Sequence, residues 1–529
     1  MGYLQLKRLL TMQRESRCHR QALAPDESAA SSEKRKGSSY QQDDNPHGSK
    51  RMRYSQLDLP EEIWQHIHSL MPMRDAARAA CLSSAFLHSW RSHPKLTFSI
   101  ETLGFVDDTT DFIKRIDCVM KKHLGIGVKA LTIQFNQLFR TKACSYLESW
   151  LQIAVTPRIE ELTIDMFSPR GKSYYNFPCS LLSDESGSSI QHLHLCCCYF
   201  CPPADFGCFQ SLTKIYLKHV KITGDGLGSL LSTSFALERL ELEYCNQIEH
   251  IKIPSEVQRL SYIEVSECLR LQVIENKAPN VDSLDIFGQG YCPIQLSFGE
   301  SSLVKNLSMD CSSALCHAFA ELPSIFPNLE TLIIDYLDEM FNTPMVPNMF
   351  LHLKDLCITL SRETLSPTYD YLSLVSLLDA CPSLDTFTLD VSAEHPEGDS
   401  IFVNPSDLRQ LPEQRHDNLR DVKITGFRSA KSLVELTYYI LKNTSVAYLT
   451  LDTTSIPYRC SPDEIGSRCF HMSKDALAEA PKAVFAIRTY IEGKVPSTVE
   501  LTVLEPCSQC HVLEPLSISM LSNGATEMQ

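Results

Sequence analysis

A short pattern of apolar positions recurs along most of the chain after residue 127. Each copy has an apolar residue, two intervening residues, a second apolar residue, one intervening residue and a third apolar residue. Copies begin roughly 21–35 residues apart. Because strand side chains alternate between two faces, the last two apolar residues of a copy predict a short strand with one buried face. The thirteen copies are Val128–Leu131–Ile133, Ile159–Leu162–Ile164, Ile190–Leu193–Leu195, Leu212–Ile215–Leu217, Leu237–Leu240–Leu242, Leu260–Ile263–Val265, Val281–Leu284–Ile286, Val304–Leu307–Met309, Leu329–Leu332–Ile334, Leu353–Leu356–Ile358, Leu384–Phe387–Leu389, Leu419–Val422–Ile424 and Val446–Leu449–Leu451.

The repeat length decides how these strands are expected to assemble. One unit of this size cannot bury its apolar face alone, so successive units must stack on one another. We therefore expect an α/β solenoid with parallel strands on its concave side and helices or loops on its convex side. A helix is predicted over residues 473–492, and a last strand over residues 499–504 closes the end. A doubly wound domain with regular alternation of strands and helices is the alternative.

A helical period replaces this pattern at residues 58–98. Asp58 can cap a first helix, and Pro60 suits its first turn. Asp75 can cap a second helix of small residues, and a third helix spans residues 85–90 and ends before Pro94. The apolar stripe of the first helix, which Pro72 ends, comprises Ile63, Trp64, Ile67, Leu70 and Met71.

This helical stretch resembles the F-box, a module that docks a protein onto the Skp-type adaptor of a cullin-based ubiquitin ligase. The resemblance rests on a Leu-Pro opening, the spacing of Ile63, Ile67, Leu70 and Pro72, then Asp75, Arg78, Cys81-Leu82-Ser83 and a downstream Trp90. It implies that the residues contacting the adaptor, or supporting that surface, are Leu59, Pro60, Ile63, Ile67, Leu70, Pro72, Cys81, Leu82 and Phe86.

The F-box resemblance has one departure and one alternative. The family often places a basic residue and then Trp or Phe shortly after the serine, whereas here Ser84 and Ala85 precede Phe86. That contact with the adaptor is therefore expected to be weaker. The alternative is a plain helical hairpin that caps a larger domain.

The repeat spacing is typical of leucine-rich repeats, and residues 416–452 resemble the FBD region that ends many plant F-box proteins. Taken together, the chain resembles a plant F-box/LRR-repeat protein. The resemblance implies an N-terminal three-helix F-box followed by a leucine-rich-repeat horseshoe. We expect a basic leader without stable structure at residues 1–54, the F-box at 55–99, the solenoid at 100–415, FBD-like terminal repeats and cap at 416–511, and a tail at 512–529.

Charge is divided unevenly along the chain. Residues 1–53 hold 11 Lys and Arg against 6 Asp and Glu, whereas the whole chain carries −15, so the remainder carries −20. An acidic body argues against broad nucleic-acid binding. The leader contains Lys34-Arg35-Lys36 and residues 50–53, Lys-Arg-Met-Arg, which resemble a two-part nuclear import signal. A solvated basic tail explains them equally well, and we expect a protein of the nucleus, the cytoplasm or both.

The 21 cysteines and the histidines suggest metal sites only weakly. Most cysteines lie in apolar repeat segments, as small buried hydrophobes do in a reducing compartment. The Cys507-Ser-Gln-Cys510-His511 spacing matches haem attachment, but no export signal accompanies it. On a repeat strand, the cysteines and histidines of residues 192–201 alternate faces and cannot all converge on one ion. His66 and His68 are expected to be solvated.

The remaining chemistry favours a binding protein over an enzyme. The sequence contains no Gly-rich phosphate loop, no nucleophile elbow and no apolar run long enough to span a membrane. We expect no catalytic residue, cofactor or metal, and no nucleic-acid or membrane partner. The resemblance implies a ubiquitin-ligase receptor that binds the Skp-type adaptor, through it cullin, and an unknown target protein. A non-ligase scaffold or sensor and a small-molecule receptor remain alternatives.

Overall fold

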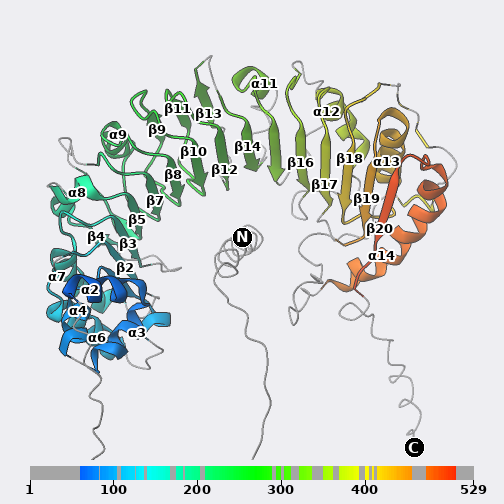
Figure 1. Cartoon of the computed structure of the whole chain (residues 1–529). Helices are drawn as coiled ribbons and strands as arrows, with labels where there is room; N and C mark the ends of the chain where they lie inside the picture. Colours follow the sequence, from blue (N-terminus) through cyan, green and yellow to red (C-terminus); the bar gives the residue numbers. More distant parts are fainter. Residues whose placement is uncertain are drawn as a thin grey trace, which may run out of the picture. The chain divides into compact units, whose positions relative to one another are not determined.

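The repeated apolar copies form consecutive strands of one sheet in a computed structural model of the chain (Figure 1). The structure describes residues 60–507 except 83, 104–108, 126, 136–139, 167–173, 183–184, 203–208, 289–293, 300–302, 311–320, 336–348, 361–368, 392–399, 404–407, 410, 412–413 and 455–471. Leu59, the leader 1–54 and the tail 512–529 lie outside the described residues. The described part belongs to one compact unit, Leu59–Gln529.

The main sheet has fifteen strands, all parallel, which follow one another along an arc in chain order (Figure 1). A parallel sheet needs a crossover between successive strands, which the convex segment of each unit provides. The strands are β1 (Lys95–Phe98), β2 (Ala130–Gln134), β3 (Glu161–Asp165), β5 (His192–Cys196), β7 (Lys214–Lys218), β8 (Arg239–Glu243), β10 (Tyr262–Ser266), β12 (Ser283–Phe287), β14 (Asn306–Asp310), β15 (Thr331–Asp335), β16 (Asp355–Leu360), β17 (Thr386–Val391), β18 (Asp421–Thr425), β19 (Tyr448–Asp452) and β20 (Glu500–Leu504).

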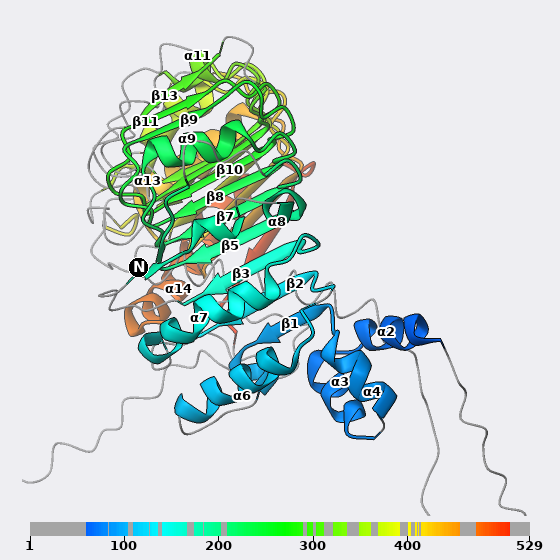
Figure 2. The same cartoon turned by 90° about the vertical axis from the view of Figure 1, so that its left-hand side faces the viewer.

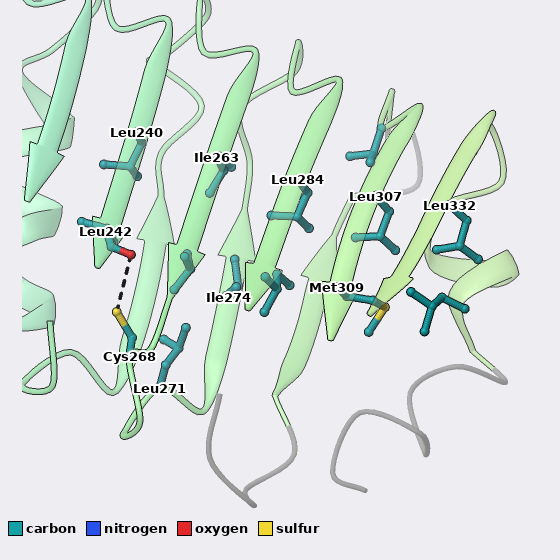
Figure 3. Close-up of a cluster of buried hydrophobic side chains, with 14 of the residues drawn as sticks. Leu240, Leu242, Ile263, Cys268, Leu271, Ile274, Leu284, Leu307, Met309 and Leu332 are labelled. Atoms are coloured by element: carbon teal, nitrogen blue, oxygen red, sulfur yellow. Dashed lines mark hydrogen bonds between the residues drawn. The ribbon is translucent and has the colours of Figure 1, made fainter. Parts of the chain in front are cut away.

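The apolar residues of the copies form continuous buried ladders. Leu240, Ile263 and Leu284 are paired in register on neighbouring strands, and each is completely buried. Figure 3 shows these side chains on the same side of the sheet, followed by Leu307 and Leu332. The first apolar residue of every copy is at most 5% exposed. The thirteen predicted copies and the predicted last strand are therefore confirmed, and the doubly wound alternative is wrong.

Strand β1 was not predicted from the sequence. It follows the predicted third helix, and Leu96 and Phe98 pair with Leu131 and Ile133 of β2. Both side chains are fully buried. The sheet therefore begins one strand earlier than the first apolar copy.

The convex side carries a second sheet where we expected only helices or loops. Strands β9 (His250–Ile253), β11 (Val273–Asn276) and β13 (Gln295–Phe298) pair in parallel on the outer side of the arc (Figure 1). Ile251 and Ile274 are fully buried between the two sheets. In this region the solenoid is a β-on-β sandwich, and two further short strands, β4 (Tyr175–Asn176) and β6 (Cys198–Tyr199), pair separately.

Helices and short helical turns provide the other convex segments. The expected helix near residues 473–492 is present as α14, η3 and η4. The helical elements of the repeat region are α5 (Ile100–Leu103), α6 (Thr109–Lys122), α7 (Arg140–Ala154), η1 (Cys179–Leu182), α8 (Glu185–Ser189), α9 (Gly224–Ser232), α11 (Leu322–Ile325), η2 (Tyr371–Leu374), α12 (Val375–Asp379), α13 (Lys431–Asn443), α14 (Lys474–Ala486), η3 (Ile487–Ile491) and η4 (Glu492–Lys494).

Three helices precede β1, as predicted: α2 (Glu61–Leu70), α3 (Met73–Ala80) and α4 (Ser84–Arg91). Pro60 is the N-cap residue of α2, and α3 begins directly after Pro72. The prediction that Asp75 caps α3 is wrong, because Asp75 lies inside the first turn and forms an exposed ion pair with Arg78 at 3.5 Å. Pro72 supplies the fixed φ that starts the helix instead.

Buried histidines connect these helices to the first strands. His93 Nε2 lies 3.0 Å from the carbonyl oxygen of His68, and His123 Nε2 lies 3.1 Å from the carbonyl oxygen of His93. All three side chains are at most 8% exposed, so the expectation that His68 is solvated is wrong, whereas His66 is exposed. Burial lowers the pKa of all three imidazoles, which keeps them neutral at pH 7.

Five successive strands of the main sheet end in a residue with left-handed backbone. Cys197, His219, Tyr244, Glu267 and Gly288 have φ between 50° and 59° and follow β5, β7, β8, β10 and β12. The N–H of the first four donates to the carbonyl at the end of the next strand, at 2.7–2.9 Å. A non-glycine residue in this conformation costs about 1–2 kcal/mol. The repeated geometry therefore shows that each unit turns out of the sheet in the same way.

Candidate protein-interaction surfaces

The residues that the F-box resemblance assigns to the adaptor surface are mostly exposed. Leu70 is 74% exposed, Leu82 79% and Ile63 44%. Large apolar side chains left in water are a common feature of protein-binding surfaces. Pro60, Pro72 and Cys81 are also exposed, and Ile67 is half-buried.

Phe86 supports this group of side chains from α4. Its ring lies 4.9 Å from the Trp64 ring in an edge-to-face arrangement and 5.2 Å from the His68 ring. These contacts join α4 to α2 and leave Phe86 half-buried. Edge-to-face pairs stabilise by about 0.5–1.5 kcal/mol beyond their buried area. Leu59, the remaining predicted residue, lies outside the described residues.

The opposite face of the same helices packs on the solenoid. Met73, Ala76 and Ala80 of α3 are buried, and Met73 belongs to the continuous core. The backbone N–H of Thr97 in β1 lies 3.2 Å from the Met73 sulfur. Figure 2 shows the three helices beside β1 and α6. The module thus has one face committed to the sheet end and another with exposed apolar side chains.

The concave face of the sheet is lined by the residues between the two buried ladders. In the centre of the arc these are Tyr216, Glu241, Glu264 and Asp285 on β7, β8, β10 and β12. They are paired in register, so each side chain neighbours the next. Neighbouring strands lie about 4.8 Å apart, which places three carboxylates side by side.

An arginine and a tyrosine pack among these carboxylates. Arg239 forms an ion pair with Glu241, and its guanidinium lies 3.9 Å from the centre of the Tyr262 ring. The Tyr262 hydroxyl oxygen lies 2.5 Å from Asp285 Oδ2 and 3.0 Å from Glu264 Oε2, so its single proton can be donated to either carboxylate. Burial, followed by Asp285, raises the pKa of Tyr262, so the hydroxyl keeps its proton and remains a donor.

A further carboxylate, Asp310, lies on the next strand along the sheet. It is 7% exposed, and Oδ2 accepts the backbone N–H of Gly288 at 2.5 Å. Oδ1 has no hydrogen-bond partner in the part of the chain that the structure describes. Burial raises the pKa of Asp310 to about 6, and the negative charges of Glu267 and Asp335 contribute in the same direction. Asp335 is the register partner of Asp310 on β15.

The residues at the start of each strand, such as Glu238 with Arg239 and Asp282 with Ser283, share no single chemistry. The informative position is the one between the last two apolar residues of each copy. It holds Glu241, Glu264 and Asp285 in three successive copies.

In the cysteine and histidine stretch of residues 192–201, the sulfurs of Cys196 and Cys197 lie 3.7 Å apart. Cys196, Cys197 and Cys198 are buried, whereas Cys201 is exposed. Within the described residues, no group of three or more His, Cys, Asp or Glu side chains is arranged to hold a metal ion. Cys510 and His511 of the haem-like spacing lie outside the described residues. No helix in the described part has both the length and the apolar content to cross a membrane.

Models of known protein families match both the repeat region and the three N-terminal helices. A family model described as "At1g61320/AtMIF1, LRR domain" matches residues 119–508. The F-box domain model matches residues 56–98. The first of these spans well over half of the chain.

The similar proteins with curated names come from Arabidopsis thaliana. The chain is 22% identical to "F-box/FBD/LRR-repeat protein At1g13570" over 404 residues, which is 74% of this chain and 88% of that protein. It is 24% identical to "Putative F-box/FBD/LRR-repeat protein At5g56810" over 415 residues, 73% of this chain and 86% of that protein. It is 29% identical to "Putative FBD-associated F-box protein At5g56560" over 188 residues, 35% of this chain and 42% of that protein.

Proposed function

Because the chain belongs to the plant F-box/LRR-repeat proteins, we propose that it is the substrate-recognition subunit of an SCF-type ubiquitin ligase. F-box domains generally bind Skp1-type adaptors, and proteins of this family are typically non-catalytic. In this proposal α2–α4 dock the adaptor, the adaptor joins cullin, and the concave face of the solenoid binds a target protein.

The observation that carries the proposal is the difference in burial between two faces of the F-box helices. Met73 of α3 is buried in the core of the solenoid, whereas Leu70 is 74% exposed and Leu82 79%. An exposed leucine gains roughly 1.5–3 kcal/mol when a partner buries it. The exposed leucines therefore favour docking of a second protein on this module.

The proposed mechanism is proximity rather than chemistry by this chain. Tethering a target beside a ubiquitin-charged enzyme turns an encounter between two molecules into an intramolecular one. The effective concentration of target lysines then rises to the millimolar range for short, flexible connections. No residue of the chain has to touch the reacting atoms, which agrees with the absence of a recognisable catalytic motif in the sequence.

The test is affinity purification of the full chain, compared with variants of the docking surface. Leu70→Ala with Leu82→Ala, and separately Leu59→Ala with Pro60→Ala, should lose the adaptor and cullin. A matched control is Leu269→Ala with Leu351→Ala, which removes two leucines that are 50% and 58% exposed on the solenoid. Adaptor binding that survives both docking-surface variants would contradict the assignment of this surface.

The alternative is a non-ligase scaffold or sensor in which the helices only cap the sheet. The burial of α3 against β1 favours that role as well. The same purification separates the two functions. Neither adaptor nor cullin in the intact sample, together with other retained partners, would support the scaffold.

A further inference from the structure

The strongest unassigned feature is a row of like charges on the concave face. Glu241, Glu264 and Asp285 stand opposite one another on three neighbouring strands. Like charges directly opposite each other destabilise a sheet. Such a row lowers the stability of the fold unless another interaction offsets the repulsion between the carboxylates.

Arg239 offsets part of this repulsion, and its contacts show what the row accepts. Arg239 places its guanidinium beside Glu241 and over the ring of Tyr262. A guanidinium gains from a carboxylate and an aromatic face together, since the ring presents negative charge to the cation. The Tyr262 hydroxyl lies between Glu264 and Asp285 and donates its one proton to this pair of carboxylates, at 2.5 Å from Asp285 and 3.0 Å from Glu264.

Asp310 gives an independent indication of a missing cationic or hydrogen-bonding partner. Ser308, two residues earlier on the same face of β14, is the register partner of Asp285, so Asp310 lies at the strand end beside the row. Its side chain is more than nine-tenths buried, and Oδ1 lacks a hydrogen-bond donor among the described residues. A buried carboxylate oxygen without a donor costs about 1–3 kcal/mol or more. The negative charges of Glu267 and Asp335 beside it add to the potential that attracts a cation to this part of the sheet.

We propose that this acidic strip, defined as Glu241, Glu264, Asp285 and Asp310, binds a Lys/Arg-bearing segment of the target protein. The inference rests on the proposed receptor function and specifies the chemistry of its target. Charge complementarity selects this occupant, because the four acidic residues of the strip outnumber the basic residues beside them on β7 and β8, which are Lys214, Lys218 and Arg239. The whole chain carries a net charge of −15, which attracts cationic partners, and the strip determines where they bind.

The first experiment measures binding of defined peptides to the full chain co-expressed with its adaptor. Fluorescence anisotropy would compare a labelled (Arg-Gly)4 peptide with a labelled (Glu-Gly)4 peptide. The Arg-Gly peptide should bind, and its affinity should fall as salt screens the charges. Equal binding of both peptides would overturn the proposal.

The second experiment uses charge-matched variants to separate the strip from the general acidity of the chain. Glu264→Gln with Asp285→Asn should weaken Arg-Gly binding about 2- to 30-fold, since each exposed pair contributes about 0.2–1 kcal/mol. The control, Glu256→Gln with Glu275→Gln, removes the same charge beside β9 and on β11 of the outer sheet. If both variants weaken Arg-Gly binding equally, the peptide is attracted by the overall charge of the chain and not by the strip, and the proposal is overturned.

An adaptor pull-down on each variant keeps this inference distinct from the proposed function. Retained adaptor with unchanged peptide binding in the strip variant would refute the strip and leave the ligase role intact. Peptide binding that depends on the strip, in a chain that never binds the adaptor, would support the strip and refute the ligase role.

Discussion

The arginine that joins the FBD-like region to the solenoid gives the sharpest stability prediction. Arg409 donates to both carboxylate oxygens of Glu435 on α13, at 2.6–2.9 Å, and to both oxygens of Asp370 before η2, at 2.6 and 2.9 Å. The Glu435 side chain is completely buried, whereas those of Arg409 and Asp370 are about half exposed. The two halves of this network should therefore differ in strength.

Replacing Arg409 by Met leaves Glu435 as a buried carboxylate without its cation. Removing one partner of a buried ion pair costs about 3–5 kcal/mol, whereas the exposed contact with Asp370 contributes only about 0.2–1 kcal/mol. Arg409 also lowers the pKa of Asp370. That smaller share of stability is complete above the ordinary aspartate pKa of about 3.9 and is lost as the pH falls below it.

Urea unfolding followed by circular dichroism measures the total, and hydrogen exchange of the α13 amides localises it. Arg409→Met should lower the unfolding free energy by about 3–5 kcal/mol and expose α13 to exchange. Adding Glu435→Gln should restore at least half of the loss, because the buried charge has gone. A loss below about 1 kcal/mol, or a double variant as unstable as the sum of its parts, would refute the reasoning.

Three further predictions follow from the core and the junction. Leu284→Ala should lower the unfolding free energy by about 3–5 kcal/mol in urea, because a fully buried side chain leaves a cavity. Gly288→Ala should lower the unfolding free energy in urea by about 1–3 kcal/mol, because φ is +59° and the new methyl group would collide with the Glu267 carboxylate. Adding Glu267→Ala should relieve the collision but not the backbone strain. Burial lowers the pKa of His93 and His123, so the unfolding free energy should decrease as the pH drops below about 6.5, their pKa in the unfolded chain. Urea midpoints at pH 7.5 and 5.5 measure this decrease. An equal decrease in the His93→Gln/His123→Gln double variant would contradict the reasoning.

The sequence predicted the main sheet because one strong signal repeats thirteen times. Leu240 and Leu242 must both be buried, and only a strand places alternate residues on one face. The outer strands escaped prediction because they have four residues each, and Ile251 and Ile274 occur without a matching copy in most units. The burial of His68 was not predicted either, because helical spacing alone does not show which face of α2 packs against α4.

The concave network could be predicted only in part. The positions of Glu241, Glu264 and Asp285 follow from the repeat, but their contacts depend on the register between residues more than twenty positions apart. The left-handed turns after the strands carry Cys, His, Tyr and Glu, so no glycine marks most of them. Tertiary hydrogen bonds between units, rather than local preference, hold that conformation. The predicted adaptor surface remains a prediction until docking is measured.

The two end strands of the main sheet differ in burial, which affects where unfolding begins. Leu501 and Val503 of β20 are half-buried, whereas Leu96 and Phe98 of β1, at the other end, are fully buried. In a stack held by neighbour contacts, the end with the weaker contact melts first. Under stress the chain should therefore unravel from its carboxyl end toward the F-box. In the proposed receptor function, a partly unfolded copy would lose its later repeats, keep its F-box, and compete with intact copies for the adaptor.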